Sequence, residues 1–215
     1  MRKKSVIAIG FIISMLLATP KVLAIEPTNP HPANAIWTEP AVIDISQYSI
    51  GDKFNITVFV NSSATSGGWQ FWLIYPSTYI NATGRIGYTA GSKSEFFQGL
   101  TTMPVAASFK DYNATHKRID FGETIISPPY RDPGYGSLAW IEFEVINLPE
   151  NTVYERFGFL DVGGTGTYIL DSTGQKPQLN VYPSVIVPEF TVLSLALLTT
   201  MGFLSVFVLK KKRKK

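Results

Sequence analysis

The sequence predicts an all-β domain folded as an antiparallel sandwich. Three observations predict it: several segments alternate apolar and polar residues, clusters of turn-forming residues separate these segments, and the segments lack a helical period. About 160 of the 215 residues remain when the terminal targeting segments are set aside, which is enough for the core of one domain.

Three segments show the alternation of a half-buried strand most clearly, because every second side chain is apolar. Their apolar faces are formed by Phe54, Ile56, Val58 and Val60, by Trp69, Phe71, Leu73 and Tyr75, and by Ala139, Ile141, Phe143 and Val145. Gly, Pro, Asn and Ser are the residues that turns favour, and they gather between the strands. The predicted turns cover residues 62–68, 81–85, 127–136 and 171–176.

The N-terminus reads as a secretory signal peptide over residues 1–24. Cations at Arg2 to Lys4 precede an apolar stretch, and the small-residue pattern Val22-Leu23-Ala24 predicts cleavage after Ala24. An uncleaved N-terminal anchor is the alternative. Residues 25–37 are rich in proline and predict an extended lead-in to a sandwich over residues 38–186.

The C-terminus predicts a membrane anchor. Residues 191–209, from Thr191 to Leu209, contain neither a charge nor a proline, and at 1.5 Å per residue such a helix reaches about 28 Å, enough to cross the hydrocarbon layer. Six basic residues follow at 210–215, and cations beside a span stay in the cytoplasm. We therefore expect a single-pass protein with its domain outside the cell and its C-terminus in the cytoplasm. A buried core helix is the alternative.

A short motif at residues 187–190 stands before this span. Val187-Pro188-Glu189-Phe190, the apolar segment and the terminal basic cluster together resemble the archaeal PEF-type C-terminal sorting signal. This resemblance implies an archaeal source and removal of the tail by an archaeosortase, with a lipid in place of the helix. Permanent anchoring by the intact helix stays open.

Composition excludes several classes of function. The net charge of +3 comes from the termini: between Ile25 and Val187 there are nine of the 19 basic residues and 15 of the 16 acidic ones. An acidic domain without a basic stripe predicts no nucleic-acid binding. The chain has no cysteine and only two histidines, so thiolate chemistry is excluded and a histidine-dependent catalytic site is not expected.

Four Asn-X-Ser/Thr sequons predict N-glycosylation of an exported domain. The acceptors are Asn55, Asn61, Asn81 and Asn113. Asn55 is expected on the outward face of a strand and the other three are expected in turns.

Three stretches carry a resemblance to cohesin domains. Residues 48–58 (YSIGDKFNITV) with 68–76 (GWQFWLIYP) resemble the opening strands of that family, residues 134–145 (GYGSLAWIEFEV) resemble its Gly-rich entry into a central strand, and residues 160–185 are similar to its closing hairpin. The resemblance covers about residues 38–186 and implies a nine-stranded jelly-roll sandwich.

The cohesin resemblance also implies a function. Cohesins are not enzymes; they bind a partner module, the dockerin, through one sheet face. Carried onto this chain, the outward positions of the strand at 68–75 belong to that face, which nominates Gln70, Trp72 and Ile74. Trp72 agrees with this on physical grounds, because exposed aromatic side chains are enriched in recognition patches. The alternative is that a loop or a second sheet covers Trp72.

The same sequence allows other functions. A carbohydrate-binding module would stack sugars on a platform formed by Trp72, by Trp140, or by Tyr130 and Tyr135. A glycosidase needs two facing carboxylates, but outward glutamates such as Glu142 and Glu144 usually form a solvated surface.

Two further readings concern calcium and the surface coat. Asp161 and Asp171 bracket a glycine-rich hairpin and could offer oxygens to calcium, although the ligand spacing of an EF-hand is missing. No other metal or cofactor is expected. A structural component of the surface coat also stays open. The main prediction is a non-catalytic adhesion or scaffold module.

Overall fold

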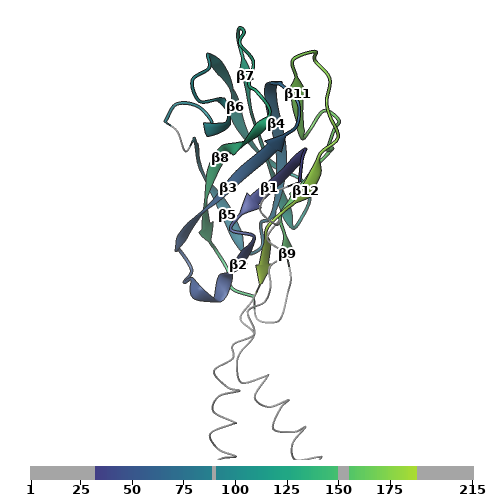
Figure 1. The fold of residues 1–215 in the computed structure, drawn as a ribbon. Coiled ribbons are helices and arrows are strands. Elements are labelled where there is room, and N and C mark those ends of the chain that lie inside the picture. The colour runs from purple at the N-terminus through teal and green to yellow at the C-terminus, as the bar shows by residue number, and fades with distance from the viewer. Residues whose placement is uncertain (1–31, 89–90, 150–154, 188–215) are drawn as a thin grey trace, which may run out of the picture. The chain divides into compact units, whose positions relative to one another are not determined.

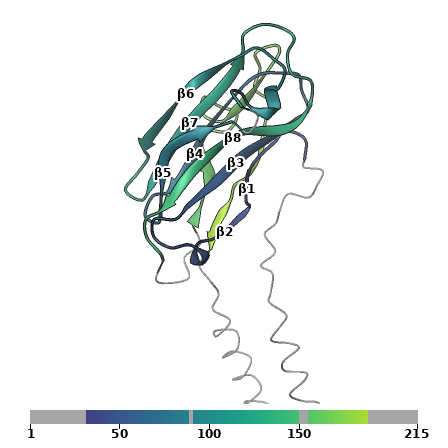
Figure 2. The ribbon, with the colours of Figure 1, turned by 90° about the vertical axis from the view of Figure 1, so that its left-hand side faces the viewer.

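The computed structural model describes residues 32–88, 91–149 and 155–187, and within these ranges the chain is almost entirely β-structure. Two sheets pack face to face as a sandwich, and a small third sheet lies at one end (Figures 1 and 2). The predicted all-β fold class is therefore confirmed. Within the same ranges, no helix is long and apolar enough to cross a bilayer. The predicted signal peptide and the predicted span lie outside them.

The first sheet has the order β12-β1-β3-β8-β5. Its strands are β12 (Asn180–Tyr182), β1 (Ala35–Glu39), β3 (Lys53–Ser62), β8 (Gly134–Val145) and β5 (Ile80–Gly87). The long central pair β3 and β8 is antiparallel, with Ile56 opposite Ile141. Polar residues of β3 and β8, including Asn55 and Glu142, face outward from this pair.

The second sheet has the order β10-β4-β7-β6, and β11 also pairs with β4. Its strands are β10 (Gly158–Phe159), β4 (Ser66–Pro76), β7 (His116–Ile125), β6 (Thr102–Asp111) and β11 (Tyr168–Asp171). The third sheet joins β2 (Val42–Asp44), β13 (Val185–Val187) and β9 (Glu155–Arg156). Two short 3-10 helices, η1 (Ile45–Gln47) and η2 (Glu95–Phe97), complete the described elements.

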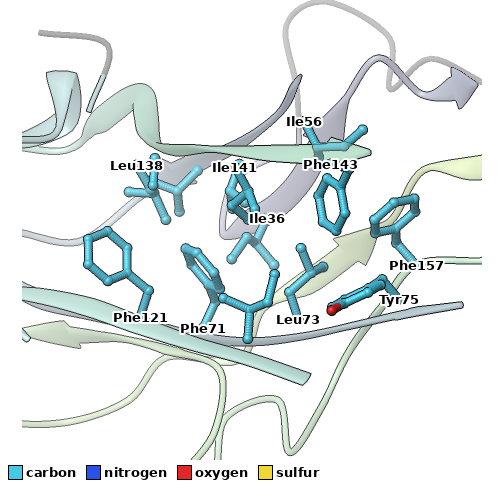
Figure 3. Packing of buried hydrophobic residues seen from close by; sticks show 14 of the residues in the cluster. Ile36, Ile56, Phe71, Leu73, Tyr75, Phe121, Leu138, Ile141, Phe143 and Phe157 are labelled. Carbon is cyan, nitrogen blue, oxygen red and sulfur yellow. The ribbon is translucent and has the colours of Figure 1, made fainter. Parts of the chain in front are cut away.

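The core lies between the two large sheets and is rich in aromatic rings (Figure 3). Phe143 of β8 is fully buried, and its ring centroid lies 5.0 Å from that of Tyr75 in the facing sheet. Phe157 and Phe54 complete this cluster, at 5.4 and 5.8 Å from Phe143. The alternation predicted for residues 53–60, 69–75 and 139–145 is confirmed, because the apolar member of each pair faces this core.

One carboxylate is buried on the inner side of β7. Glu123 is 1% exposed, and its two oxygens accept hydrogen bonds from the Ser94 backbone N–H (3.2 Å) and the Thr102 hydroxyl (2.6 Å). Burial, and secondarily the charge of Glu123, raise the pKa of Tyr88. The two hydrogen bonds fasten the start of β6 and the segment before it to β7, so a buried charge helps to position one edge of the second sheet.

Several predicted details are wrong. The first strand begins at Ala35, inside the predicted lead-in, because Ala35 to Trp37 are buried between β3 and β12. The sandwich is not purely antiparallel, since β1 pairs with β12 and β2 with β13 in parallel. In the described residues there are thirteen strands rather than nine, and the expected closing hairpin is absent, since β11 and β12 belong to different sheets.

The predicted turn at 81–85 lies within strand β5. Its register against β8 shifts between Ala82 and Ile86, so the residues with poor β propensity, such as Gly84 at φ 85°, form an irregularity that the strand absorbs. Asn81 is consequently in a strand, and so is Asn61, at the end of β3. Three sequons were expected in turns, and of these Asn113 alone lies in a turn.

The aromatic cluster predicts the response to truncation of Phe143. We expect Phe143→Ala to destabilise a segment spanning residues 25–187 by about 3–5 kcal/mol, because the ring leaves a cavity between the sheets. Ile126→Ala is the matched control, since this side chain is 61% exposed, and it should change stability by no more than about 0.5 kcal/mol. Urea unfolding measures both, and similar losses in the two variants would contradict this description of the core.

Candidate functional site

The outer face of the second sheet combines aromatic, charged and apolar side chains, and we call it the β4 face. Successive side chains of a strand point to opposite sides, so the residues between the core positions of β4, β7 and β6 lie together on this face. They are Gln70, Trp72 and Ile74 of β4, Arg118, Asp120 and Gly122 of β7, and Met103, Val105 and Lys110 of β6.

Trp72 lies near the centre of the β4 face and is half-buried. The guanidinium carbon of Arg118 lies 4.0 Å from the centroid of the indole, a cation–π contact. Gly166 packs against the same ring so closely that an ideal Cβ there would be 2.6 Å from an indole carbon. The indole is therefore held between a neighbouring strand and a loop, with part of its surface left accessible.

An ion-pair cluster extends from Trp72 across β7 to β6. Arg118 donates one hydrogen bond to Asp120, from Nη2 to Oδ2 at 3.0 Å, and its Nε lies 2.6 Å from Oδ1 as an ion-pair contact without hydrogen-bond geometry. Lys110 also pairs with Asp120, with its Nζ 2.8 Å from the Asp120 Oδ2. The Arg118 and Asp120 side chains are only 19% and 16% exposed, so water screens this ion pair less than a surface pair, and the pair holds the guanidinium over the indole.

The segment 160–167 covers part of the β4 face and is held by Asp161. The Asp161 carboxylate accepts hydrogen bonds from the Thr165 N–H (2.6 Å), the Thr165 hydroxyl (2.7 Å) and the Gly166 N–H (3.0 Å). These bonds, the one from the Thr165 hydroxyl first, lower the pKa of Asp161. From β4, the Gln70 amide donates to the Thr165 and Gly166 carbonyls at 2.9 and 3.1 Å.

The three nominated residues share one face but differ in role. Gln70 uses its amide to hold the segment 160–167, and Ile74 packs against Gly158 of β10. Trp72 is partly covered by a loop and is less exposed than its outward position predicts, which agrees with the alternative to a fully exposed ring. Of the three, Trp72 retains both accessible surface and charged neighbours.

Sequence reasoning missed Arg118, Asp120 and Lys110. The signal for the first two was available, because residues 116–125 alternate polar side chains with the buried Ile119, Phe121, Glu123 and Ile125. Which outward side chains of β7 meet Trp72 depends on the register between strands. That register places Asp120 opposite Trp72 and Arg118 opposite Ile74.

The four aromatic residues of the carbohydrate platform do not form one surface. Trp72 lies on the outer face of the second sheet, whereas Trp140 lies on the outer face of the first, where Gly87 and the Tyr88 carbonyl cover it. Tyr135 is 71% exposed on β8, and Tyr130 packs near Gly67. Trp72 and Trp140 therefore belong to separate surfaces, since the two sheets lie between them, and carbohydrate binding stays an untested prediction.

The carboxylates considered for catalysis and calcium have other partners. Glu142 pairs with Arg85 (3.1 Å) and Lys53 (3.7 Å) on an outer surface. Asp171 accepts hydrogen bonds from the Thr173 N–H and hydroxyl and from the Gln175 N–H, which close a turn and lower its pKa. Among residues 32–88, 91–149 and 155–187, no group of three or more acidic or histidine side chains could hold a metal. Calcium binding stays an untested prediction.

Three of the four sequons lie on the first sheet, and the fourth lies in the turn that joins two strands of the β4 face. Asn55, Asn61 and Asn81 belong to β3 and β5 of the first sheet, and Asn113 lies in the turn between β6 and β7. Asn55 and Asn113 are exposed, whereas Asn61 and Asn81 are half-buried. The Asn61 amide nitrogen donates to the Pro32 carbonyl at 3.2 Å, and the Asn81 amide oxygen accepts from Lys117 at 3.3 Å.

No protein-family model matches this chain, and no curated protein matches it. Among solved structures it is similar to the type II cohesin A11 of Bacteroides cellulosolvens, at 17% identity and a TM-score of 0.51, over 72% of this chain and 99% of that one. This likeness shows that the fold is cohesin-like.

Two other cohesins are similar to a slightly lower degree. The non-cellulosomal cohesin of the archaeon Archaeoglobus fulgidus has 13% identity and a TM-score of 0.48, over 74% of this chain and 92% of that one. The sixth cohesin of scaffoldin B of Acetivibrio cellulolyticus, in complex with a mutant Cel5 dockerin, has 12% identity and a TM-score of 0.49, over 74% and 100%.

The lowered pKa of Asp161 predicts how the segment 160–167 responds to acid. The pKa of Asp161 in the folded domain lies below the ordinary 3.8. The stabilisation that this carboxylate gives to the segment is therefore fully present above the unfolded-state pKa and is lost as the pH falls through the folded-state pKa. We expect the Thr165 and Gly166 amide protons to be protected at neutral pH, and their protection factors, which are corrected for the intrinsic exchange rate at each pH, to fall in acid. In Asp161→Asn they should exchange faster already at neutral pH, and unchanged protection there would contradict this role. Amide hydrogen exchange by NMR measures the effect.

Proposed function

We propose that this chain is a non-catalytic recognition module displayed on the cell surface, and that the β4 face binds a protein partner. The observation that carries the proposal is the cluster of Trp72, Arg118 and Asp120 near the centre of that face. Tryptophan and arginine are the residues most enriched in binding hot spots. Here the ion pair with Asp120 already orders the arginine, so little side-chain entropy is lost on binding.

The kind of partner is inferred from the fold. The cohesin-like fold, together with the sequence resemblance to a family that binds dockerins through one sheet face, supports a dockerin-like module as the partner. The apolar Met103 and Val105, 55% and 48% exposed, extend the proposed contact surface toward the edge strand β6. Lys110 and Arg118 against the single Asp120 leave the centre of the face with a net positive charge, which favours an acidic complement on the partner.

The distribution of sequons supports the same face. Glycans at Asn55, Asn61 or Asn81 would cover the first sheet, and a glycan at Asn113 would project from the turn between β6 and β7. A bulky hydrated glycan blocks the surface beneath it. The three sequons of the first sheet thus leave the surface around Trp72 open to a partner.

Display at the surface rests on the terminal segments. The leader at residues 1–24, the apolar segment Thr191 to Leu209 and the basic residues 210–215 support export followed by anchoring, with the domain outside. The Pro188-Glu189-Phe190 motif supports sorting of the PEF type, in which the tail is exchanged for a lipid. Either route holds the domain at the outer surface of the membrane.

Binding through the β4 face predicts a strong effect of Trp72→Ala. We expect this variant to lose about 2 kcal/mol or more of binding free energy, roughly a 30-fold weaker Kd, because a central hot-spot ring is removed. Trp140→Ala is the matched control, since it removes a half-buried tryptophan from the outer face of the opposite sheet.

The measurement is a pull-down from surface extracts of the source organism, followed by titration calorimetry with the recovered partner. Loss of a dockerin-like partner in Trp72→Ala but not in Trp140→Ala supports the proposal. Equal binding by both variants, or recovery of polysaccharide instead of protein, would contradict it.

The geometry of the sequons predicts unequal glycosylation. We expect Asn113 and Asn55 to carry glycans, because both are exposed, and Asn61 to stay unmodified, because its amide nitrogen, the atom a glycan would join, is hydrogen-bonded and half-buried. Mass spectrometry of glycopeptides from the native protein measures the occupancy of each site. A modified Asn61 beside an unmodified Asn113 would show that accessibility in the folded domain does not decide the modification.

A further inference from the structure

Three large apolar side chains are exposed in two neighbouring connections at one end of the sandwich. Ile50 is 64% exposed, Ile146 43% and Leu148 36%. The connection before β3 and the connection after β8 are joined by hydrogen bonds from the Gly51 N–H to the Val145 carbonyl (2.8 Å) and from the Val145 N–H to the Asp52 carbonyl (2.9 Å). We call Ile50, Ile146 and Leu148 the apolar tip.

The described chain ends beside this tip. Val187, the last residue of β13, pairs in parallel with Asp44 of β2. Asp44 caps η1, which leads within a few residues to Ile50. Both views show β2 and the η1 segment together at the same end of the sandwich (Figures 1 and 2). The chain therefore leaves the domain at the end that carries the apolar tip.

The distance from this end to the predicted span is short. Only Pro188, Glu189 and Phe190 separate Val187 from Thr191, and three extended residues reach about 10 Å. If the chain is anchored through Thr191 to Leu209, as proposed above, the tip is held next to the bilayer surface. A short tether gives a high effective concentration, so contacts too weak to bind a membrane alone become occupied.

We propose that the apolar tip inserts into the interfacial region of the bilayer that anchors the chain. This inference rests on the proposed anchoring. Lipid is the partner of the apolar tip because the short tether brings the membrane to these side chains. Trp72 lies on the outer face of the second sheet and not among the residues of the tip, so insertion of the tip does not occupy the proposed partner surface.

The charges near the tip indicate apolar rather than electrostatic contact. Asp44 and Asp52 lie at this end. Asp44 accepts a hydrogen bond from the Ser46 hydroxyl (2.6 Å), and Asp52 accepts one from the Ser49 N–H (2.7 Å). Lys53 stands opposite Glu144 across the strand pair. With no excess of cations among these groups, attraction to anionic lipid does not drive the contact. The insertion should therefore be insensitive to salt.

The test uses the full chain, which has no cysteine, so single cysteines can be labelled without background. Ile50→Cys carries an environment-sensitive fluorophore at the tip, and Gln175→Cys carries it on an exposed turn next to β11, near the start of β4 and so at the opposite end. Each is reconstituted into phosphatidylcholine vesicles that contain a lipid with a shallow nitroxide quencher. Flotation of the vesicles measures anchoring separately.

We expect the Ile50→Cys label to be quenched several-fold more than the Gln175→Cys label. Adding Ile146→Ser and Leu148→Ser should reduce that quenching at least by half while the chain still floats. Raising the salt from about 0.1 M to about 1 M, which shortens the Debye length from about 10 to about 3 Å, should leave it unchanged.

Each other outcome overturns the inference in a distinguishable way. Equal quenching of the two labels in chains that float overturns tip insertion and leaves anchoring intact. Chains that fail to float overturn the anchoring and the insertion together. Quenching that salt abolishes, or that survives the two serine substitutions unchanged, overturns the apolar contact.

Discussion

The contact between Tyr75 of β4 and Phe143 of β8 joins the two sheets, and the arrangement of the domain depends on it. Their ring centroids lie 5.0 Å apart in an edge-on geometry, and both side chains are almost completely buried. Because side chains alternate along a strand, committing Tyr75, Leu73 and Phe71 to the core commits Ile74, Trp72 and Gln70 to the outer face. The core thus determines which residues are available for recognition.

The same constraint organises the charged cluster. The register of β4 against β7 sets Asp120 opposite Trp72, and a slip by one residue would turn Arg118 and Asp120 into the core and Glu123 out of it. The buried Glu123, held by Ser94 and Thr102, opposes such a slip, because its hydrogen-bond donors exist only on the inner side. The buried Glu123 on the inner side and the Arg118–Asp120 ion pair on the outer side therefore both favour the observed register of β4 against β7.

The proposed functions divide the surface of the sandwich among separate tasks. One sheet carries three sequons, the other carries the Trp72 cluster, and one end carries both the apolar tip and the exit of the chain. A module anchored by a short tether gains from this division, because neither the glycans of the first sheet nor contact of the tip with the membrane covers the surface around Trp72. The segment 160–167, held by Asp161 and Gln70, limits how much of Trp72 a partner reaches.

The sequence by itself determined the all-β class, the inward and outward residues of β3, β4 and β8, and the nomination of Trp72, because alternation is a local property of each strand. It did not determine the parallel pairing of β1 with β12, the strand position of Asn81, or the placement of Trp72 and Trp140 on opposite sheets. Arg118 over Trp72 and Gly166 against it were decided by tertiary structure alone. Those contacts join residues 46 and 94 positions apart, and pairing over such separations depends on the packing of the whole core.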